Sequence, residues 1–310
     1  MRKHLPGSFH LHPDVSNAIA RGLPIVALES AVITHGLPRP LNHELALEME
    51  EILRQRGICP ATVAVINGKF TIGLTPEELE QLSEDESAIK INLRNIGIAL
   101  SQRLNGGTTV AATLFAAKTT GIKVFATGGI GGVHRGNSLD ISSDLNALEE
   151  CPVLVVCAGA KAILDLPATL EALETRGIPV IGYRTDEFPA FYSRESGLKL
   201  DFNASSAEMI AEIAEAHWQI GSQQAVLVGN PIPAENALNS QYLTTAIEEA
   251  VKTAELAGIH GTPLTPYLLE RLNQATSGES LKANLALLKN NAVLAAEIAR
   301  HLYPSGVVSY

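Results

Sequence analysis

The chain has 310 residues, of which 46% are hydrophobic and 18% charged, a composition typical of a well-packed globular protein. Its formal net charge of -10 argues against a nucleic-acid-binding surface, although a local pocket can still bind a small anion. No apolar run is long enough to span a membrane, the N-terminal residues lack the apolar region of a secretory signal, and the three cysteines cannot pair completely. We therefore expect a reduced, cytoplasmic protein with no membrane partner and with cysteines that pack in the core.

The first third of the chain predicts alternating helices and strands. Residues 14–21 are expected to form a helix with Asp14 as its N-cap. The apolar run at 24–33 predicts a buried strand that carries one carboxylate, Glu29. Residues 43–56 have helical periodicity, with carboxylates early and arginines late, as the helix dipole favours.

A turn signal and a helix signal follow. The dipeptide Asn67-Gly68 predicts a tight hairpin turn between two strands within 61–74. Further on, the stretch 106–121 predicts a helix that is opened by glycine and threonine.

Strands and helices also alternate through the middle of the chain. Apolar runs at 123–129, 153–159 and 178–184 predict buried strands, and helices are expected between them at 140–150 and 163–177. This alternation favours parallel strands joined by helical crossovers. We therefore expect an α/β fold with three α/β/α layers and a mostly parallel or mixed central sheet.

The last third is predicted to be mostly helical. Helices are expected over 205–221, 241–258 and 280–303, with one further strand over 225–233. Because no low-complexity linker divides the chain, we expect residues 1–310 to form a single domain.

Polar side chains gather where two predicted strands end. Lys161 follows the strand at 153–159, and Asp140 and Asp144 follow the strand at 123–129. The carboxyl ends of parallel strands are where α/β proteins bind ligands. Two explanations fit Lys161. Desolvation would lower its pKa and make its neutral amine a nucleophile, or its aliphatic stem would extend outward and leave the ammonium group in water. The aspartates are explained either as helix caps or as ligands of a hard cation such as Mg²⁺ or Mn²⁺.

Glu29 lies inside an apolar run, where a carboxylate needs a partner or a raised pKa. A raised pKa would suit a general acid. The structural alternative is a buried salt bridge, for example with Lys90 or Lys161. A surface-pointing side chain is less favoured because both flanks are apolar, and we favour the functional role.

Other polar groups fit both a structural and a functional role. His134 would suit Mn²⁺, although a lone histidine in a loop is usually solvated. Thr109 opens a predicted helix whose free N–H groups form an anion cradle, and threonine capping alone explains it equally well. Asn290 and Asn291 lie on a mostly apolar helix. Their amides would either hydrogen-bond to a polar ring of a ligand or form a hydrogen bond to another helix. The glycine run at 128–132 lacks the spacing of a dinucleotide or phosphate loop.

Several long segments carry one resemblance. They read ALESAVITHGLPRPLN, GGTTVAAT, KVFATGGIGGVHRG, DISSDL, VVCAGAKAILDLPATLEALET and SLKANLALLKNNAVLAAEIA. Together they resemble the pseudouridine-5′-phosphate glycosidase family, which includes the indigoidine-synthase-A-like proteins, over almost the whole chain. The resemblance implies reversible cleavage of the C–C glycosidic bond of pseudouridine 5′-phosphate, giving uracil and ribose 5-phosphate. It also implies one Mn²⁺-type divalent ion per subunit and a homotrimer.

The resemblance also implies roles for individual residues. It places the Schiff-base lysine on Lys161, the general acid on Glu29 and the metal ligand on Asp140. It places substrate contacts on Lys90, Val110, Ser142, Ser143 and Asp144, to which we add Arg94, Thr109, His134 and Asn291 as candidate contacts. A lysine imine suits this chemistry because a C–C glycoside has no basic leaving oxygen for the usual scheme of two carboxylates.

The chain departs from the family pattern in two places. Ala31 stands where the family usually has threonine, and residues 90–95 read K-I-N-L-R-N where the family has K-V-S-R-R-D. Lys90 and Arg94 remain, so we predict an enzyme with weaker phosphate binding. Two alternatives stay open: a Schiff-base sugar-phosphate lyase or aldolase with another substrate, and a catalytically silent binding protein with the same fold.

Overall fold

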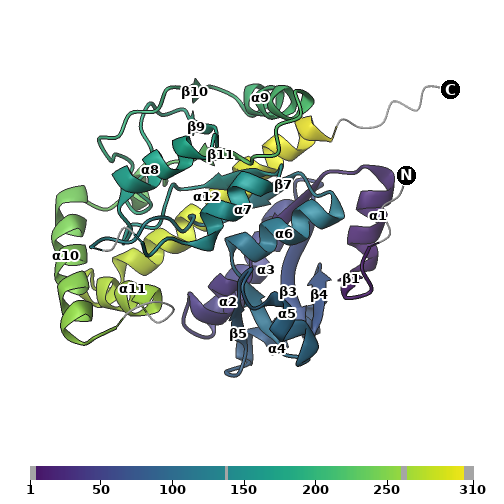
Figure 1. Cartoon of the computed structure of the whole chain (residues 1–310), viewed down its shortest axis with the longest axis horizontal. Helices are drawn as coiled ribbons and strands as arrows, with labels where there is room; N and C mark the ends of the chain where they lie inside the picture. The colour runs from purple at the N-terminus through teal and green to yellow at the C-terminus, as the bar shows by residue number, and fades with distance from the viewer. Residues whose placement is uncertain (1–4, 137–138, 260–263, 304–310) are drawn as a thin grey trace.

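A computed structural model describes residues 5–136, 139–259 and 264–303. At its centre the described residues form one sheet of eleven strands (Figure 1). These are β1 (Phe9–Leu11), β2 (Ile25–Leu28), β3 (Cys59–Ile66), β4 (Lys69–Ile72), β5 (Ile89–Ile91), β6 (Gly106–Thr108), β7 (Val124–Ala126), β8 (Leu154–Cys157), β9 (Val180–Tyr183), β10 (Asn203–Ala204) and β11 (Val226–Gly229). Their order is β1-β4-β3-β2-β7-β8-β11-β9-β10, with β6 beside β3 and β5 beside β6. β3 is antiparallel to β4 and β6, and the other pairings between these strands are parallel.

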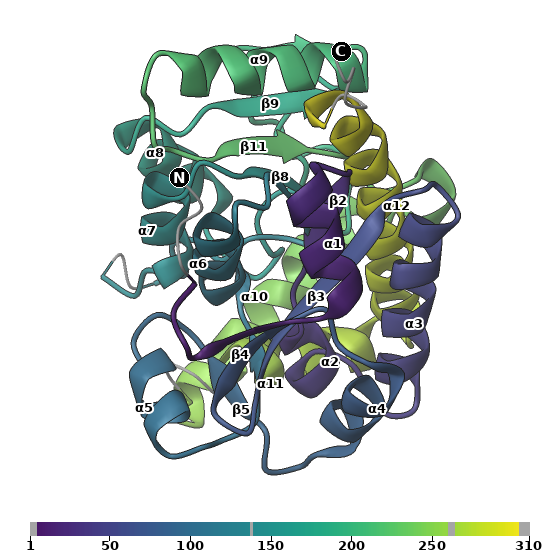
Figure 2. The same cartoon turned by 90° about the vertical axis from the view of Figure 1, so that its right-hand side faces the viewer.

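Helices cover both faces of the sheet, with α3 and α12 on one side and α6 and α7 on the other (Figure 2). The helices are α1 (Pro13–Arg21), α2 (Ala31–His35), α3 (Leu41–Arg54), α4 (Pro76–Glu84), α5 (Ile96–Ser101), α6 (Val110–Thr120), α7 (Ser143–Glu150), α8 (Leu166–Thr175), α9 (Ala207–Gln219), α10 (Ser240–Leu256), α11 (Leu264–Ala275) and α12 (Glu279–Leu302), with a 3₁₀ turn at Ala234–Asn236. The predicted helical character of the C-terminal third is confirmed. Within the described ranges, no helix is both long and apolar enough to cross a membrane.

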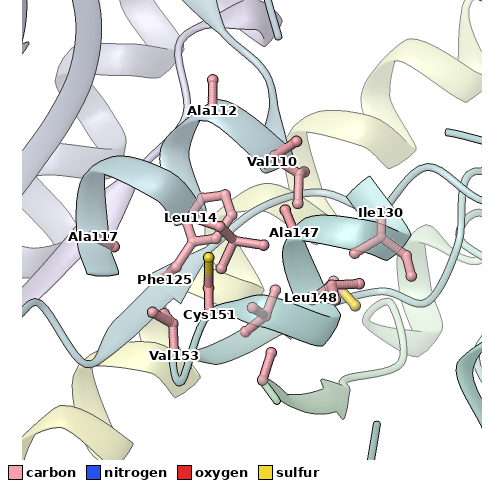
Figure 3. Packing of buried hydrophobic residues seen from close by; sticks show 14 of the residues in the cluster. Val110, Ala112, Leu114, Ala117, Phe125, Ile130, Ala147, Leu148, Cys151 and Val153 are labelled. Atoms are coloured by element: carbon pink, nitrogen blue, oxygen red, sulfur yellow. The ribbon is translucent and has the colours of Figure 1, made fainter. Parts of the chain in front are cut away.

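The two faces of the sheet carry separate apolar layers. Along β2, Ile25 and Ala27 pack into one layer and Val26 and Leu28 into the other. α6 and α7 complete the first layer, where Cys151 is buried as predicted (Figure 3), and α3, α9 and α12 complete the second. Because both faces are covered, the central strands read as continuous apolar runs. The predicted α/β fold with a mostly parallel, mixed sheet is confirmed.

The strand predicted at 24–33 is wrong in its second half, since β2 ends at Leu28 and helix α2 follows. Ser30 Oγ donates to the Val63 carbonyl at 2.5 Å and accepts from the Thr108 amide at 2.9 Å. These bonds fix the chain to two other strands as it leaves β2. Continuous apolar sequence conceals this change of direction.

The helix predicted at 106–121 begins later than expected. Gly106 and Gly107 belong to β6, and α6 follows them. A Cβ atom on Gly106 would lie 2.3 Å from the Ile89 carbonyl oxygen, and one on Gly107 would lie 2.3 Å from Thr34 Oγ1. These glycines therefore allow β6 to approach its neighbours and do not start the helix.

Two predicted N-caps are also wrong. His12 caps α1, with its Nδ1 accepting from the Asp14 amide at 3.2 Å, so Asp14 lies in the first turn. Ser142, and not Asp140, caps α7, because Ser142 Oγ accepts from the Asp144 amide at 3.2 Å. Asp140 therefore has no capping role at α7.

The hairpin predicted around Asn67-Gly68 is confirmed. Both residues have positive φ angles, 49° and 70°, as a type I′ turn between antiparallel strands requires. The short elements β1, β5, β10, α2 and α5 had no sequence prediction, because so few residues carry no full period. Helix α11 was not predicted either.

Candidate active site

A cavity of about 390 Å³ opens at the carboxyl ends of β2, β7 and β8. It is lined by all but two of the predicted site residues. Those present are Glu29, Lys90, Arg94, Thr109, His134, Asp140, Ser142, Ser143, Asp144 and Lys161. The position is the one that a parallel sheet predicts for a ligand site.

Glu29 follows the last residue of β2 and lines the cavity. The hydroxyl of Thr127, which follows β7, donates to Glu29 Oε1. Burial raises the pKa of the Glu29 carboxyl, and the ammonium of Lys161 and the Thr127 bond offset only part of that rise. Among the described residues, no ion pair joins Glu29 to Lys90 or Lys161. The salt-bridge alternative for Glu29 is therefore excluded, and the carboxyl has the environment of a general acid.

Lys161 follows β8 in a segment fixed by backbone hydrogen bonds. Its amide donates to the Ile130 carbonyl at 3.0 Å, and its carbonyl accepts from the Leu164 amide at 2.9 Å. Gly159 precedes it with φ +87°, and a Cβ atom there would lie 1.9 Å from the Pro189 carbonyl oxygen. The half-buried Lys161 side chain lines the cavity, so the outward-snorkelling alternative does not describe it.

Asp144 is buried and joins two backbone segments of the cavity wall. Its Oδ1 accepts from the Ala111 amide in the first turn of α6 at 2.9 Å, and its Oδ2 accepts from the Gly131 amide at 2.8 Å. Part of the anion cradle predicted at α6 is thus filled by the protein's own carboxylate. Thr109 caps α6 by accepting from the Ala112 amide at 3.4 Å, which is its structural role.

Asp140 and His134 lie together on the cavity wall. The His134 amide donates to the Asp140 carbonyl at 2.9 Å, and both side chains face the cavity. Burial lowers the pKa of His134, and the Asp140 carboxylate offsets part of that change. The described residues contain no group of three or more His, Cys, Asp and Glu side chains that could hold an ion. This donor set fits a hard divalent ion that keeps most of its water, as Mg²⁺ does when one or two carboxylates bind it.

Residues 90–95 form a closed turn at the mouth of the cavity. The Asn92 amide donates to Asn95 Oδ1 at 2.8 Å, the Arg94 amide donates to Asn92 Oδ1 at 3.0 Å, and Asn95 Nδ2 donates to the Lys90 carbonyl at 2.9 Å. The two asparagines that depart from the family motif therefore hold this turn. Burial, followed by the charge of Lys161, lowers the pKa of Lys90.

Two predicted contacts lie outside the cavity. Val110, the first residue of α6, is buried in the apolar layer that α6 and α7 share (Figure 3), so its side chain does not line the cavity. Asn291 is fully buried on α12, where its Nδ2 donates to the Thr127 carbonyl at 2.8 Å and its Oδ1 accepts from Asn230 at 2.9 Å. Asn291 therefore holds the strand ends behind the cavity and does not line it.

Sequence reasoning missed other residues that line the cavity. They include His35, Asn92, Phe191 and Asn284, together with Leu269 and Leu288. His35 comes just after the run at 24–33 that was assigned to a strand, and Asn284 lies about two helical turns before Asn291 on α12. Helical periodicity along α12 is the signal that points to Asn284.

Comparison with known proteins identifies the family. The sequence profile described as "Indigoidine synthase A like protein" matches residues 14–301. The chain belongs to this family. The resemblance drawn from the sequence motifs is therefore confirmed.

The similarity to known proteins extends over nearly the whole chain. A protein of Caldanaerobacter subterraneus subsp. tengcongensis named pseudouridine-5′-phosphate glycosidase is 51% identical, over 94% of this chain and 96% of its own. One of the same name from Geobacillus kaustophilus is 50% identical, over 93% and 97%. The structure of the prealnumycin C-glycosynthase AlnA in complex with ribulose 5-phosphate has a TM-score of 0.89 and 38% identity, over 96% of this chain and 98% of that one. An indigoidine synthase A-like protein from Thermotoga maritima has a TM-score of 0.87 and 36% identity, over the same shares.

Asp144→Asn tests the link through the Asp144 carboxylate. An amide offers one oxygen where the carboxylate offers two, so the backbone N–H of Ala111 or Gly131 loses its acceptor. We expect the free energy of unfolding to fall by about 1–3 kcal/mol, measured by urea denaturation. Asp201→Asn, the same change at an exposed position, is the control and should leave the midpoint unchanged. Equal midpoints for both variants would show that the link is not needed.

Proposed function

We propose that this chain is a pseudouridine-5′-phosphate glycosidase, which reversibly cleaves pseudouridine 5′-phosphate to uracil and ribose 5-phosphate. The observation that carries the proposal is that Lys161 and Glu29 face one cavity at the carboxyl ends of β8 and β2. The relatives that bear this name are about half identical to the chain over nearly its full length, which supports the substrate.

The first half of the proposed reaction opens the sugar. Lys161 first gives its ammonium proton to solvent and then attacks C1′ as the neutral amine, and the C1′–O4′ bond breaks. The ring oxygen leaves with both electrons and takes the proton held by Glu29. Glu29 then removes a proton from the Lys161 nitrogen, which has become positively charged. C1′ is now bonded both to Lys161 and to C5 of uracil.

The second half breaks the C–C bond. Glu29 gives its proton to C5 of uracil as the C1′–C5 bond breaks, and the electrons of that bond stay on the base. The lone pair of the Lys161 nitrogen forms the C1′=N bond of a protonated imine at the same time, and the proton released when this imine is hydrolysed returns to Glu29. Hydrolysis by one water molecule then releases ribose 5-phosphate and regenerates the amine. The raised pKa of Glu29 suits a group that must carry a proton at neutral pH.

The remaining cavity residues are proposed to bind and orient the substrate. Lys90 and Arg94 supply positive charge toward the phosphate, and the hydroxyls of Ser142 and Ser143 face the sugar. Asp144 keeps the backbone of this wall in place through its two amide bonds. Because the Val110 side chain is buried, any contact of Val110 with the substrate is proposed to be made by its backbone.

We propose Asp140 as the protein ligand of one divalent ion per subunit, Mn²⁺, with His134 beside it. Such an ion, when bound, supplies positive charge that polarises substrate oxygens. We also propose that residues 1–310 form one domain, that the enzyme acts as a homotrimer and that it is cytoplasmic.

A second candidate is Schiff-base chemistry on another pentose phosphate. It is favoured by the altered segment at 90–95 and by the similarity to a C-glycosynthase whose structure contains ribulose 5-phosphate. The same lysine would form the imine, so the two candidates differ in whether uracil is used.

Lys161→Ala tests the covalent step. Borohydride reduction in the presence of ribose 5-phosphate should add one pentose phosphate to the wild-type chain at Lys161, detected by peptide mass spectrometry. The alanine variant should form no adduct and show no turnover. Lys90→Met removes the other lysine of the cavity and should still form the adduct. An adduct on Lys90 in the wild type, or normal turnover by Lys161→Ala, would exclude the proposed nucleophile.

Glu29→Gln tests the proton donor. Because the pKa of Glu29 is raised, its proton is held to higher pH than on an ordinary glutamate, and activity should decline as pH rises through that raised pKa. The glutamine variant should lose roughly 10²–10⁴-fold in kcat and lose this alkaline limb of the pH profile. Glu208→Gln, at an exposed position on α9, should keep both. A Glu29→Gln profile parallel to the wild type would remove Glu29 from the mechanism.

Asp140→Ala tests the metal site. Removing this ligand should weaken Mn²⁺ binding by at least about ten-fold, measured by the electron paramagnetic resonance signal of free Mn²⁺. Asp201→Ala is the control, since it removes an exposed carboxylate. Equal Mn²⁺ affinity in the two variants would place the ion elsewhere.

A further inference from the structure

The mouth of the cavity carries a side chain that the proposed mechanism does not use. His35 ends α2 and lines the cavity together with Asn92 and Arg94. His35 and Arg94 are exposed, whereas Lys90 is half-buried. Burial, followed by the charge of Lys90, lowers the pKa of His35, so its ring is neutral at pH 7 and lies within the field of Lys90.

A hydrogen bond fixes the orientation of this ring. Thr34 Oγ1 lies 2.6 Å from His35 Nδ1 and 3.4 Å from the Ser30 carbonyl oxygen. That carbonyl already accepts the amides of Ile33 and Thr34 at 3.0 and 3.1 Å. We therefore assign the Thr34 hydroxyl proton to His35 Nδ1, which leaves the ring proton on Nε2.

The position of Thr34 depends in turn on Gly107. A Cβ atom on Gly107 would lie 2.3 Å from Thr34 Oγ1 and 2.6 Å from the Ser30 carbonyl oxygen. The glycine in β6 thus leaves room for the hydroxyl that orients His35. This contact joins β6, α2 and the mouth of the cavity in one packed arrangement.

We propose that His35 is a specificity-determining residue that donates its Nε2–H to the 5-phosphate of the substrate at the mouth of the cavity, beside Lys90 and Arg94. The inference rests on the proposed function and adds to it a contact that selects phosphorylated sugars. A neutral imidazole that carries its proton on Nε2 is a hydrogen-bond donor, and a bond to a charged phosphate oxygen is stronger than one between neutral groups.

The charges along the cavity explain why the phosphate lies at the mouth. A phosphate dianion is costly to remove from water, and the exposed mouth lets it keep part of its hydration. The cavity also carries the carboxyl groups of Glu29, Asp140 and Asp144, which repel a dianion when ionised. With the phosphate held by the mouth, the opposite end of the pentose is directed toward Lys161.

The test compares binding of ribose 5-phosphate and ribose to the full-length protein by calorimetry. In His35→Leu the Kd for ribose 5-phosphate should rise roughly ten-fold, while binding of ribose should not change. His35→Gln restores an N–H donor near the Nε2 position and should recover most of the affinity. His10→Leu, at an exposed position on β1, is the control and should match the wild type.

The outcomes separate this inference from the proposed function. An unchanged Kd for ribose 5-phosphate in His35→Leu, or an equal loss for ribose, overturns the phosphate contact. The expected loss in His35→Leu, together with no imine adduct at Lys161 in the wild type, overturns the proposed function and leaves the contact supported. Because His35 is exposed, unchanged thermal unfolding of the variants is expected and shows that the loss is local.

Discussion

One buried carboxylate holds the parts of the cavity together. Asp144 accepts one amide from Ala111, at the N-terminal end of α6, and one from Gly131, in the turn after β7. Negative charge is favoured at a helix N-terminus, so the ionised carboxylate is stabilised there. The same turn supplies the Ile130 carbonyl that accepts the Lys161 amide. The backbone that carries the lysine therefore depends on a link that Asp144 makes to a different helix.

Around this frame the cavity separates two kinds of chemistry. Near the strand ends, Glu29 and Lys161 combine a carboxyl of raised pKa with an amine, the pair that a covalent proton-transfer reaction needs. His35 at the exposed mouth provides an oriented donor for an anion, and the half-buried Lys90, whose charge also acts on Glu29, provides a cation. A sugar phosphate that spans the two regions is fixed at one end while it reacts at the other. Positioning of this kind supplies a large share of the rate acceleration in such enzymes.

The sequence predicted the central strands because both faces of the sheet are buried, and it predicted most of the cavity because strand ends collect polar side chains. It did not predict α2, since an apolar run over 24–33 does not reveal that Ser30 bonds to two other strands. It also placed Asn291 in the cavity. In sequence, an amide on an apolar helix gives the same pattern whether it binds a ligand or hydrogen-bonds to buried carbonyl groups. His35 was missed because an orienting hydroxyl on the neighbouring residue leaves no periodic signal.

The central claim is that this cavity joins uracil and a pentose phosphate through carbon. The most direct measurement incubates the purified protein with ¹³C-labelled uracil, ribose 5-phosphate and Mn²⁺, followed by mass spectrometry of the nucleotides formed. The account predicts labelled pseudouridine 5′-phosphate, whose bond between base and sugar survives acid. An imine adduct at Lys161 with no uptake of labelled uracil would contradict it and would show that the lysine serves another pentose phosphate reaction.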